Sequence, residues 1–413
     1  MKKIFILLII SFYNLNLYSQ DIKYAHNILD SLCSNNYYGR GYSFDGDKIA
    51  CYYLANELKS FNLKPILQPF NVSVNVFDNN ADIFLEEQKL IAGKDFNVNP
   101  ISQSLNKTVK LFYLNSISKS NLKKLSKILT TKDSNTTIIF DTTNIDKDII
   151  NKYYNEIQKH NKEISKLSIN FVKKLPPQGI ASKQERYSEF YILNKYNNGK
   201  KLNINFDAQL KFSYITNNII AIKKGEVDTF QVVTAHYDHV GTLGKNCYFP
   251  GAHDNASRCA MVMDLAKYFS KLPKTHYSLA FILFSGEELG LLGSYNYVRK
   301  PIFPLEKIKN LINLDMLGSG DEGIMIVNGS VLKEEFSKFQ NINKTNNYVP
   351  QILSRGEAAN SDHYYFYKKG VKSMYIYTMG QYKEYHNIND KSENIPMPIY
   401  DGIFNLVKDF ITE

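Results

Sequence analysis

Hydrophobic and polar positions follow two different patterns along the chain. Apolar residues recur at helical spacing over residues 22–33 and 46–61, and strand-like stretches follow at 66–76 and 81–86. From about residue 207 onward, short and mostly apolar runs typical of buried strands alternate with segments of helical periodicity. This alternation predicts an α/β fold, with a mostly parallel mixed sheet that carries helices on both faces.

The second half of the chain contains most of these predicted elements. Its strand-like runs are 219–223, 230–235, 279–284, 311–314, 323–327 and 373–377. Its helical segments are 255–270, 289–298, 333–340, 361–368 and 398–410. In open α/β sheets, ligands bind beyond the carboxyl ends of the strands, so we expect the functional residues there.

The middle of the chain has a different composition, rich in lysine, asparagine and serine. Between Ile101 and Phe206 there are 19 lysine and arginine residues against 8 acidic ones, an excess of +11. Weak patterns predict strands at 109–114 and 137–140 and helices at 121–129 and 146–167. We interpret this block as an inserted α/β subdomain with a solvated basic surface, or alternatively one that meets an anionic envelope or acidic peptides.

The first twenty residues have the pattern of a secretory signal peptide. Lys2 and Lys3 precede an unbroken apolar run over residues 4–10, which is too short to span a bilayer. We expect cleavage near Ser19 or Gln20 and find no later run suited to an integral membrane segment. The expected location is therefore secreted or periplasmic. The predicted organisation is a signal peptide at 1–20, the N-terminal part of the catalytic domain at 21–95, the inserted basic subdomain at 96–206 and the catalytic domain at 207–413.

Composition and charge exclude several classes of protein. With 44% hydrophobic and 13% aromatic residues, the chain can bury a core and is not intrinsically disordered. The net charge of +10 lies almost entirely in the middle block, without the arginine and aromatic interleaving of nucleic-acid binders. Four cysteines in an oxidising compartment permit two disulfides, of which Cys33–Cys51 and Cys247–Cys259 form the simplest pairing. The sequence does not determine the oligomeric state.

Acidic and histidine residues follow several of the predicted strands. These residues are His236, Asp238 and His239 after the strand 230–235, Asp254 before the helix 255–270, Glu287 and Glu288 after the strand 279–284, Asp315 after the strand 311–314, and His386 further along the chain. Each taken alone is explained by a turn, a helix start or a core histidine. Together at one edge, these carboxylates would repel one another strongly without a cation. Nitrogen and oxygen ligands of this kind suit Zn²⁺, or less specifically Mn²⁺ or Co²⁺, and five ligands with one shared carboxylate suit two adjacent metals.

The motifs around these residues resemble a known enzyme family. In order, they read AHYDHVG, PGAHDNAS, LFSGEELGLLGS, NLDMLG, NSDH and YHN, between about residues 230 and 390. This set is similar to the co-catalytic zinc exopeptidases, which include bacterial leucyl aminopeptidase, aminopeptidase Y and glutamate carboxypeptidase. The segment Tyr38-Gly39-Arg40-Gly41 resembles the beginning of some members. The resemblance implies the phosphorylase/hydrolase-like fold of these enzymes, and no motif of the inserted block matches.

The resemblance also implies a role for each candidate residue. His236 and Asp315 would bind one zinc ion, Glu288 and His386 the other, and Asp254 would bridge the two. Asp238 would accept a hydrogen bond from His236. Glu287 would be the general base, which takes a proton from the activated water and passes it to the leaving amine. A cis peptide bond is implied between Asp254 and Asn255.

Other positions near these motifs depart from the family pattern or are secondary. Arg258 stands where glycine is usual, and would either reach a carboxylate of the substrate or point to solvent. His253 stands where aspartate is frequent, and Asn387 replaces the commoner threonine. We expect a structural role for His239 rather than that of a third metal ligand, a structural rather than a site role for His253, and an orienting role for Asp362 in its loop. Tyr377, Tyr382 and Tyr385 are candidate pocket walls.

The leading functional hypothesis is an exported di-zinc aminopeptidase that acts on peptides. A carboxypeptidase of the same family is the first alternative, since Arg258, Arg355 and the basic block could bind a C-terminal carboxylate. A glutaminyl cyclase-like enzyme would use one zinc ion, and the complete ligand set favours two. A binding protein with a decayed site is disfavoured because all five ligands and the base are present.

Overall fold

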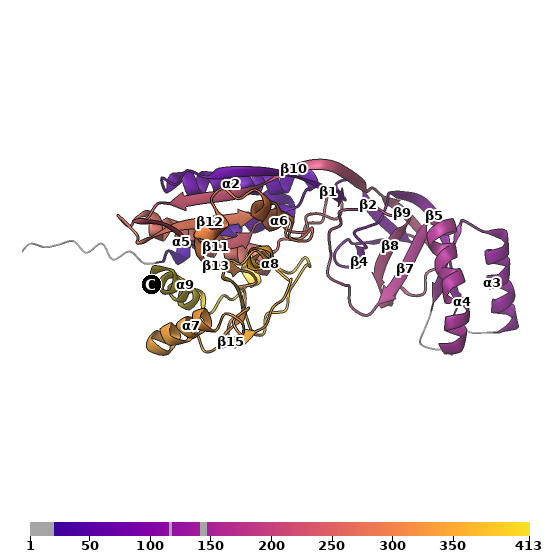
Figure 1. The fold of residues 1–413 in the computed structure, drawn as a ribbon. Helices are drawn as coiled ribbons and strands as arrows, with labels where there is room; N and C mark the ends of the chain where they lie inside the picture. The colour runs from indigo at the N-terminus through magenta and orange to yellow at the C-terminus, as the bar shows by residue number, and fades with distance from the viewer. Residues whose placement is uncertain (1–19, 115–117, 141–146) are drawn as a thin grey trace, which may run out of the picture.

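The protein folds into two bodies that lie side by side along one axis, as Figure 1 shows for a computed structural model. The structure describes residues 20–114, 118–140 and 147–413. The main body contains an eight-stranded sheet and its helices, and the insertion body contains two smaller sheets. The long strands β1 (Ile66–Val76) and β10 (Gln209–Lys223) run along the main sheet toward the insertion body.

The main sheet has the strand order β1-β10-β12-β11-β13-β16-β14-β15. Its other strands are β11 (Val227–His236), β12 (Tyr277–Phe284), β13 (Ile308–Leu314), β14 (Ile324–Val327), β15 (Ile352–Arg355) and β16 (Ser373–Thr378). The four central strands β12, β11, β13 and β16 are parallel to one another. β1 and β10 are antiparallel to their neighbours, and β14 is antiparallel to β16. The sheet is therefore mixed, and the parallel pairing that was predicted is found at its centre and between β14 and β15 at one edge.

Helices cover both faces of this sheet because residues of each strand point alternately to opposite sides. Ile219 and Ala221 of β10 face a core that they share with α1, α2, α5 and α9, whereas Ile220 faces α6 and α8. The helices of the main body are α1 (Ile22–Cys33), α2 (Gly46–Ser60), α5 (Ser257–Ser270), α6 (Leu292–Arg299), α7 (Lys333–Asn346), α8 (His363–Lys368) and α9 (Tyr400–Thr412). α5 lies deepest, and 11 of its residues are buried. Its first turn is consequently fixed at the carboxyl edge of the sheet.

The insertion body consists of two sheets with helices at its outer end (Figure 1). One sheet has the order β3-β2-β9-β5-β6 and the other β4-β8-β7. The strands are β2 (Ala81–Leu85), β3 (Gln88–Leu90), β4 (Phe96–Val98), β5 (Leu105–Leu114), β6 (Thr136–Phe140), β7 (Leu167–Val172), β8 (Ser188–Leu193) and β9 (Lys201–Phe206), and the helices are α3 (Lys119–Thr131) and α4 (Lys147–Lys159). Its core also includes Val240, Leu243 and Phe249 from the loop after β11. The two bodies therefore share a hydrophobic contact.

The insertion body differs from the sequence prediction in its boundary, in one helix and in several short strands that were not predicted. β2 pairs with β9 and β3 with β2 in its larger sheet, so this sheet begins before the expected boundary at residue 96. The predicted helix 146–167 ends at Lys159 and continues as a π-helical turn over His160–Ser165, and Leu167 begins β7. Lysine and asparagine alternate with aliphatic residues here, so the helical and strand patterns are locally similar.

Two further predictions concern the cysteines and the first twenty residues. Cys33, Cys51, Cys247 and Cys259 are all free and buried, so the pairing Cys33–Cys51 and Cys247–Cys259 is wrong. Residues 1–19 of the predicted signal peptide lie outside the described residues. Within the described ranges, no helix has the length and apolar character needed to cross a bilayer.

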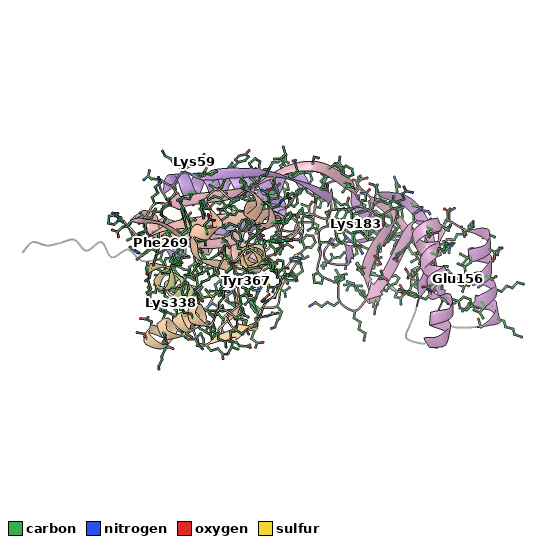
Figure 2. The ribbon with its side chains drawn as sticks, viewed as in Figure 1. Lys59, Glu156, Lys183, Phe269, Lys338 and Tyr367 are labelled. Carbon is green, nitrogen blue, oxygen red and sulfur yellow. The ribbon has the colours of Figure 1, made fainter. Side chains whose placement is uncertain are left out.

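Burial in the main core predicts which substitutions destabilise the fold. Figure 2 labels Phe269 on α5 and Lys59 on α2. Phe269 is completely buried, whereas Lys59 is exposed. Phe269→Ala is expected to lower the free energy of unfolding by about 3–5 kcal/mol because it leaves a cavity. Lys59→Ala, the control, should change it by less than about 0.5 kcal/mol. Equilibrium denaturant unfolding measures both values, and equal effects would contradict the packing described here.

Candidate metal centre

The parallel centre of the main sheet brings the sequence-predicted residues together at one edge. Each of its strands ends at that edge, and the chain then continues into the segment that carries a candidate residue. His236 is the last residue of β11, Asp254 lies in the turn Ala252–Ala256 before α5, Glu287 and Glu288 follow β12, Asp315 follows β13, and His386 lies in the loop after β16. The peptide bond between Asp254 and Asn255 is cis, as the family resemblance implies.

Two groups of possible ligand atoms form around Asp254. In position A, Nε2 of His386 lies 3.0 Å from Oδ2 of Asp254 and 3.1 Å from Oε1 of Glu288. In position B, Nε2 of His236 lies 3.3 Å from Oδ1 of Asp254 and 3.5 Å from Oδ1 of Asp315. The two oxygens of Asp254 thus face different positions, as a bridging carboxylate requires.

These separations fit a zinc ion in each position. Zinc bonds of about 2.0–2.1 Å in tetrahedral geometry place neighbouring ligand atoms about 3.3–3.4 Å apart. Oδ1 of Asp254 is buried and forms no hydrogen bond in the described part of the chain, although His236 is near it. A buried carboxylate oxygen without a hydrogen-bond partner is costly, and a cation would satisfy it. The residues present therefore fit a pair of metal ions.

The electrostatics of the site also favour added positive charge. Burial disfavours a charged imidazole at His236, but Glu287 and the other nearby carboxylates outweigh it and raise its pKa well above the usual range. The pKa of His386 is also raised, since Glu288 and Asp254 outweigh the effect of burial. Burial, together with the charge of Asp315, raises the pKa of Glu287. A cluster of buried carboxylates favours the protonated form of each neighbouring group, so it raises the pKa of the two histidines and of Glu287.

The support of His236 differs in one detail from the sequence prediction. Its Nδ1 lies 3.1 Å from the main-chain oxygen of Asp238 and 3.7 Å from the carboxylate of that residue. The hydrogen bond is therefore made to the main chain, because the Asp238 carboxylate accepts instead from the Tyr42 hydroxyl at 3.2 Å and from the Glu287 main-chain N–H at 3.2 Å. Asp238 consequently fixes the backbone of the predicted general base as well as the histidine.

His386 is oriented by the chain segment between β7 and β8, which sequence analysis does not predict. Its Nδ1 lies 2.9 Å from the main-chain oxygen of Gln178, and the Gln178 N–H donates to the main-chain oxygen of His386 at 2.9 Å. The Gln178 side chain is buried and bonds to the main chain of Val98 through both its oxygen and its nitrogen. The two residues that meet at His386 are 208 positions apart, so no local pattern could reveal the contact.

Arg40 is a second residue whose importance the sequence only hinted at. Its side chain is completely buried and donates to the main-chain oxygens of Leu32, Tyr237, Pro250 and Gly251. It thereby ties the end of β11 to the turn that carries Asp254. The neighbouring Gly41 must lack a side chain, because a Cβ there would lie 2.4 Å from the Cα of Gly241.

The remaining polar candidates occupy different places. His239, expected to be structural, lies within position A, with Nδ1 at 2.9 Å from Oε1 of Glu288. His253 accepts a hydrogen bond from the Gly318 N–H, and burial lowers its pKa to about 4, consistent with a structural role. Asp362 is completely buried, which raises its pKa to about 7. Arg258, expected to face substrate or solvent, is completely buried and donates to Oδ1 of Asp315 at 2.9 Å.

A cavity of about 400 Å³ opens onto the candidate ligands. It is lined by His236, His253, Asp254, Glu287, Asp315, Met316, Asn360, Tyr375, Tyr382, Lys383, Glu384 and Tyr385. Two of the three predicted pocket tyrosines are present, whereas Tyr377 is absent and Tyr375 takes part. Tyr385 also stacks on the ring of His386, with ring centroids 3.8 Å apart. Glu287, with a side chain 14% exposed, faces this cavity and can reach a molecule bound there.

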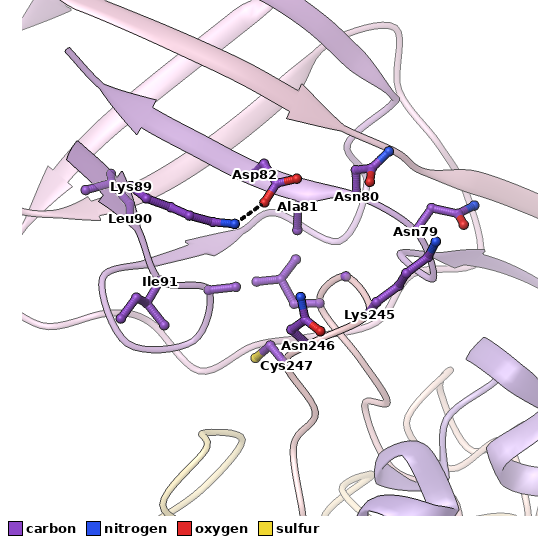
Figure 3. Close-up of a pocket in the computed structure, with 13 residues that line it drawn as sticks. Asn79, Asn80, Ala81, Asp82, Lys89, Leu90, Ile91, Lys245, Asn246 and Cys247 are labelled. Carbon is purple, nitrogen blue, oxygen red and sulfur yellow. Dashed lines mark ion pairs between the residues drawn. The ribbon is translucent and has the colours of Figure 1, made fainter. Parts of the chain in front are cut away.

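A separate pocket of about 230 Å³ lies where the insertion body meets the loop after β11 (Figure 3). Asp82 and Lys89 form an ion pair across part of it, and Asn246 and Cys247 line the other part. None of the candidate metal ligands lines this pocket. His236, Asp254, Glu287 and Asp315 instead line the cavity of about 400 Å³.

Comparisons with known proteins agree with this geometry. Aminopeptidase YwaD of Bacillus subtilis is 31% identical over 216 residues, which are 49% of this chain and 46% of the relative, so the match spans about half of each. A zinc aminopeptidase structure from Bacillus subtilis has a TM-score of 0.68 at 18% identity and covers 96% of both chains. Porphyromonas gingivalis glutaminyl cyclase has a TM-score of 0.53 at 13% identity and covers 95% of this chain and 97% of its own. The structural matches show a shared α/β fold.

The sequence profile of Peptidase family M28 matches residues 218–411, a segment that begins within β10 and ends within α9. All five candidate metal ligands and Glu287 lie inside it. This segment of the chain is therefore similar to Peptidase family M28.

Proposed function

We propose that the protein is an exported aminopeptidase that uses two zinc ions to remove N-terminal residues from peptides. The observation that carries the proposal is the pair of ligand groups that share Asp254, with ligand atoms 3.0–3.5 Å apart. Asp254, Glu288 and His386 would hold one ion, and His236, Asp254 and Asp315 the other. Mn²⁺ or Co²⁺ could replace zinc with the same ligands. Export rests on the signal-like pattern of residues 1–20.

Bound zinc would lower the pKa of a water molecule and polarise the scissile carbonyl. Glu287 is the residue suited to move the proton. Its Oε2 lies 4.0 Å from Nε2 of His236, and its main-chain N–H is held by Asp238, so the carboxylate is directed at the cavity. It would accept a proton from the attacking water and return it to the leaving amine. Glu288, its neighbour, would remain a ligand because its Oε1 faces His386.

The charges around the cavity favour a substrate amine over a substrate carboxylate. Glu384 adds a further carboxylate to the lining, and among the described residues Lys383 is the one lysine or arginine that lines it. A protonated N-terminus would be attracted to these acidic groups. Arg258 cannot bind a C-terminal carboxylate, because it is buried and bonded to Asp315. The same fold and metal groups can support a carboxypeptidase or a glutaminyl cyclase, so substrate polarity decides among these activities.

Substrate polarity, whether the enzyme acts on the N-terminus or the C-terminus of a peptide, can be tested directly. The zinc-loaded protein should release the N-terminal amino acid from a free-amine peptide, and N-acetylation should prevent release because it removes the amine and its charge. Amino-acid analysis of paired free and N-acetylated peptides measures this. Release from the C-terminus of both peptides would establish a carboxypeptidase, and cyclisation of an N-terminal glutamine without hydrolysis would establish a cyclase.

Substitution of Glu287 tests its role as the general base. Glu287→Gln should lower kcat by about 10²–10⁴-fold, because the amide cannot accept the proton. Zinc content measured by elemental analysis should stay unchanged. Glu393→Gln, at an exposed position, is the matched control and should retain full activity. Loss of zinc in the Glu287 variant would show that the residue is a ligand and not the base.

Substitution of Asp254 tests its role as the carboxylate shared by both metal positions. Asp254→Ala should remove zinc from both positions, because each depends on one oxygen of this side chain. Asp401→Ala removes an exposed aspartate on α9 and should leave the zinc content unchanged. Dialysis against saturating zinc followed by elemental analysis gives the number of ions per chain. Two ions retained by the Asp254 variant would refute the bridging role.

A further inference from the structure

Arg258 is a buried cation beside one of the two metal positions. It lies in the first turn of α5, and its side chain is completely buried. Its Nη1 donates to Oδ1 of Asp315 at 2.9 Å and to Oδ1 of Asn255 at 3.1 Å. Oδ1 of Asp315 is the same atom that lies 3.5 Å from Nε2 of His236. The arginine therefore bonds to a ligand atom of position B.

Asp315 has hydrogen bonds to both of its oxygens. Ser361 donates to its Oδ2 at 2.9 Å, so the guanidinium and the hydroxyl together hold the carboxylate in place. A carboxylate oxygen has two lone pairs, so Oδ1 can accept from Arg258 and still coordinate a metal ion. The charge of the guanidinium nevertheless remains next to that metal ion. In a buried site such a charge is only weakly screened.

Among the residues that the structure describes, no arginine or lysine bonds to a carboxylate of position A. Of the side chains grouped there, Asp254 and Glu288 are carboxylates and His239 and His386 are imidazoles. Nδ1 of His386 is bonded to the main-chain oxygen of Gln178, which leaves its Nε2 directed at Asp254 and Glu288. Position A therefore combines two carboxylates with no lysine or arginine bonded to either in the described part of the chain, whereas Asp315 of position B is paired with a guanidinium.

Stability of the fold does not explain this arginine well. Its Nε and Nη2 are buried and have no hydrogen-bond partner among the residues that the structure describes. A buried guanidinium with unsatisfied donors is costly, and replacing a buried ion pair by apolar groups is often neutral or stabilising. The side chain is also too deeply buried to contact a substrate. Its direct contact is with the metal-binding carboxylate, so its effect on metal binding is the property to examine.

We infer that Arg258 makes the two metal positions unequal, so that position A binds zinc tightly and position B binds it at least about tenfold more weakly. This inference rests on the two-metal site of the proposed function. At limiting zinc the chain then holds one ion, coordinated by Asp254, Glu288 and His386. The second ion enters position B only as the zinc concentration rises. Arg258 is a positioning residue here, since it acts through Asp315.

Zinc titration of the full chain tests the inference without reference to catalysis. After the protein is stripped with a chelator, isothermal titration calorimetry with zinc should show two binding steps of one ion each, with dissociation constants at least about tenfold apart. Asp315→Asn, which weakens a ligand of position B, should abolish the weaker step and leave the tighter one. Two equal steps in the unmodified protein, or loss of the tighter step in the Asp315 variant, would overturn the inference.

Variants at Arg258 test the cause. Arg258→Met keeps a long side chain without charge and should bring the second dissociation constant to within about threefold of the first. Arg258→Lys keeps a positive charge and should preserve the gap, and Arg299→Met controls for removal of an exposed arginine. A gap unchanged in the methionine variant would refute the role of Arg258. If that variant does not fold, the titrations of the unmodified and Asp315 proteins still decide whether the positions are unequal.

The two proposals can fail separately. Unequal zinc binding by a protein that releases no amino acid from any peptide would refute the proposed function and leave the inference intact. Hydrolysis of free-amine peptides by a protein that binds two zinc ions equally tightly would support the proposed function and refute the inference about Arg258.

Discussion

Like charges buried at one edge of a sheet are the constraint on which this structure depends. Asp254, Glu288 and Asp315 lie within 3.0–3.5 Å of two histidine nitrogens, in surroundings that exclude most water. Such an arrangement is unfavourable unless positive charge balances it. The elevated pKa values of His236 and His386 express that requirement, and divalent cations would also satisfy it. The surrounding hydrogen bonds then serve to hold each side chain where repulsion would otherwise move it.

Those supporting bonds come from distant parts of the chain. Arg40 connects the end of β11 with the turn before α5 through main-chain oxygens. Gln178 orients His386 from the long segment between β7 and β8, and the loop after β11 packs into the core of the insertion body. The insertion body is therefore physically linked to the metal centre at two places. A change in its position would alter the orientation of a candidate ligand.

Much of the fold and the site could be predicted from the sequence. The strand 66–76 and the helix 22–33 have the predicted bounds, because their apolar spacing is strong and their ends carry clear polar signals. The insertion body was less predictable, since β7, β8 and β9 are strands of only six residues, too short for a clear periodic pattern. The disulfide prediction was wrong because four buried thiols were counted without knowledge of their distances.

The sequence by itself determined which side chains would gather at the candidate site, because carboxylates and histidines after apolar strands can meet at the carboxyl edge of a sheet. It also determined the α/β class, because the spacing of its apolar positions alternates between that of strands and that of helices. Only the tertiary structure decided how these side chains are divided between the two candidate metal positions. The two oxygens of Asp254 face opposite groups, His239 joins one of them, and Arg258 turns inward to the other. Side-chain direction and burial depend on packing between segments far apart in the chain, and no local pattern contains that information.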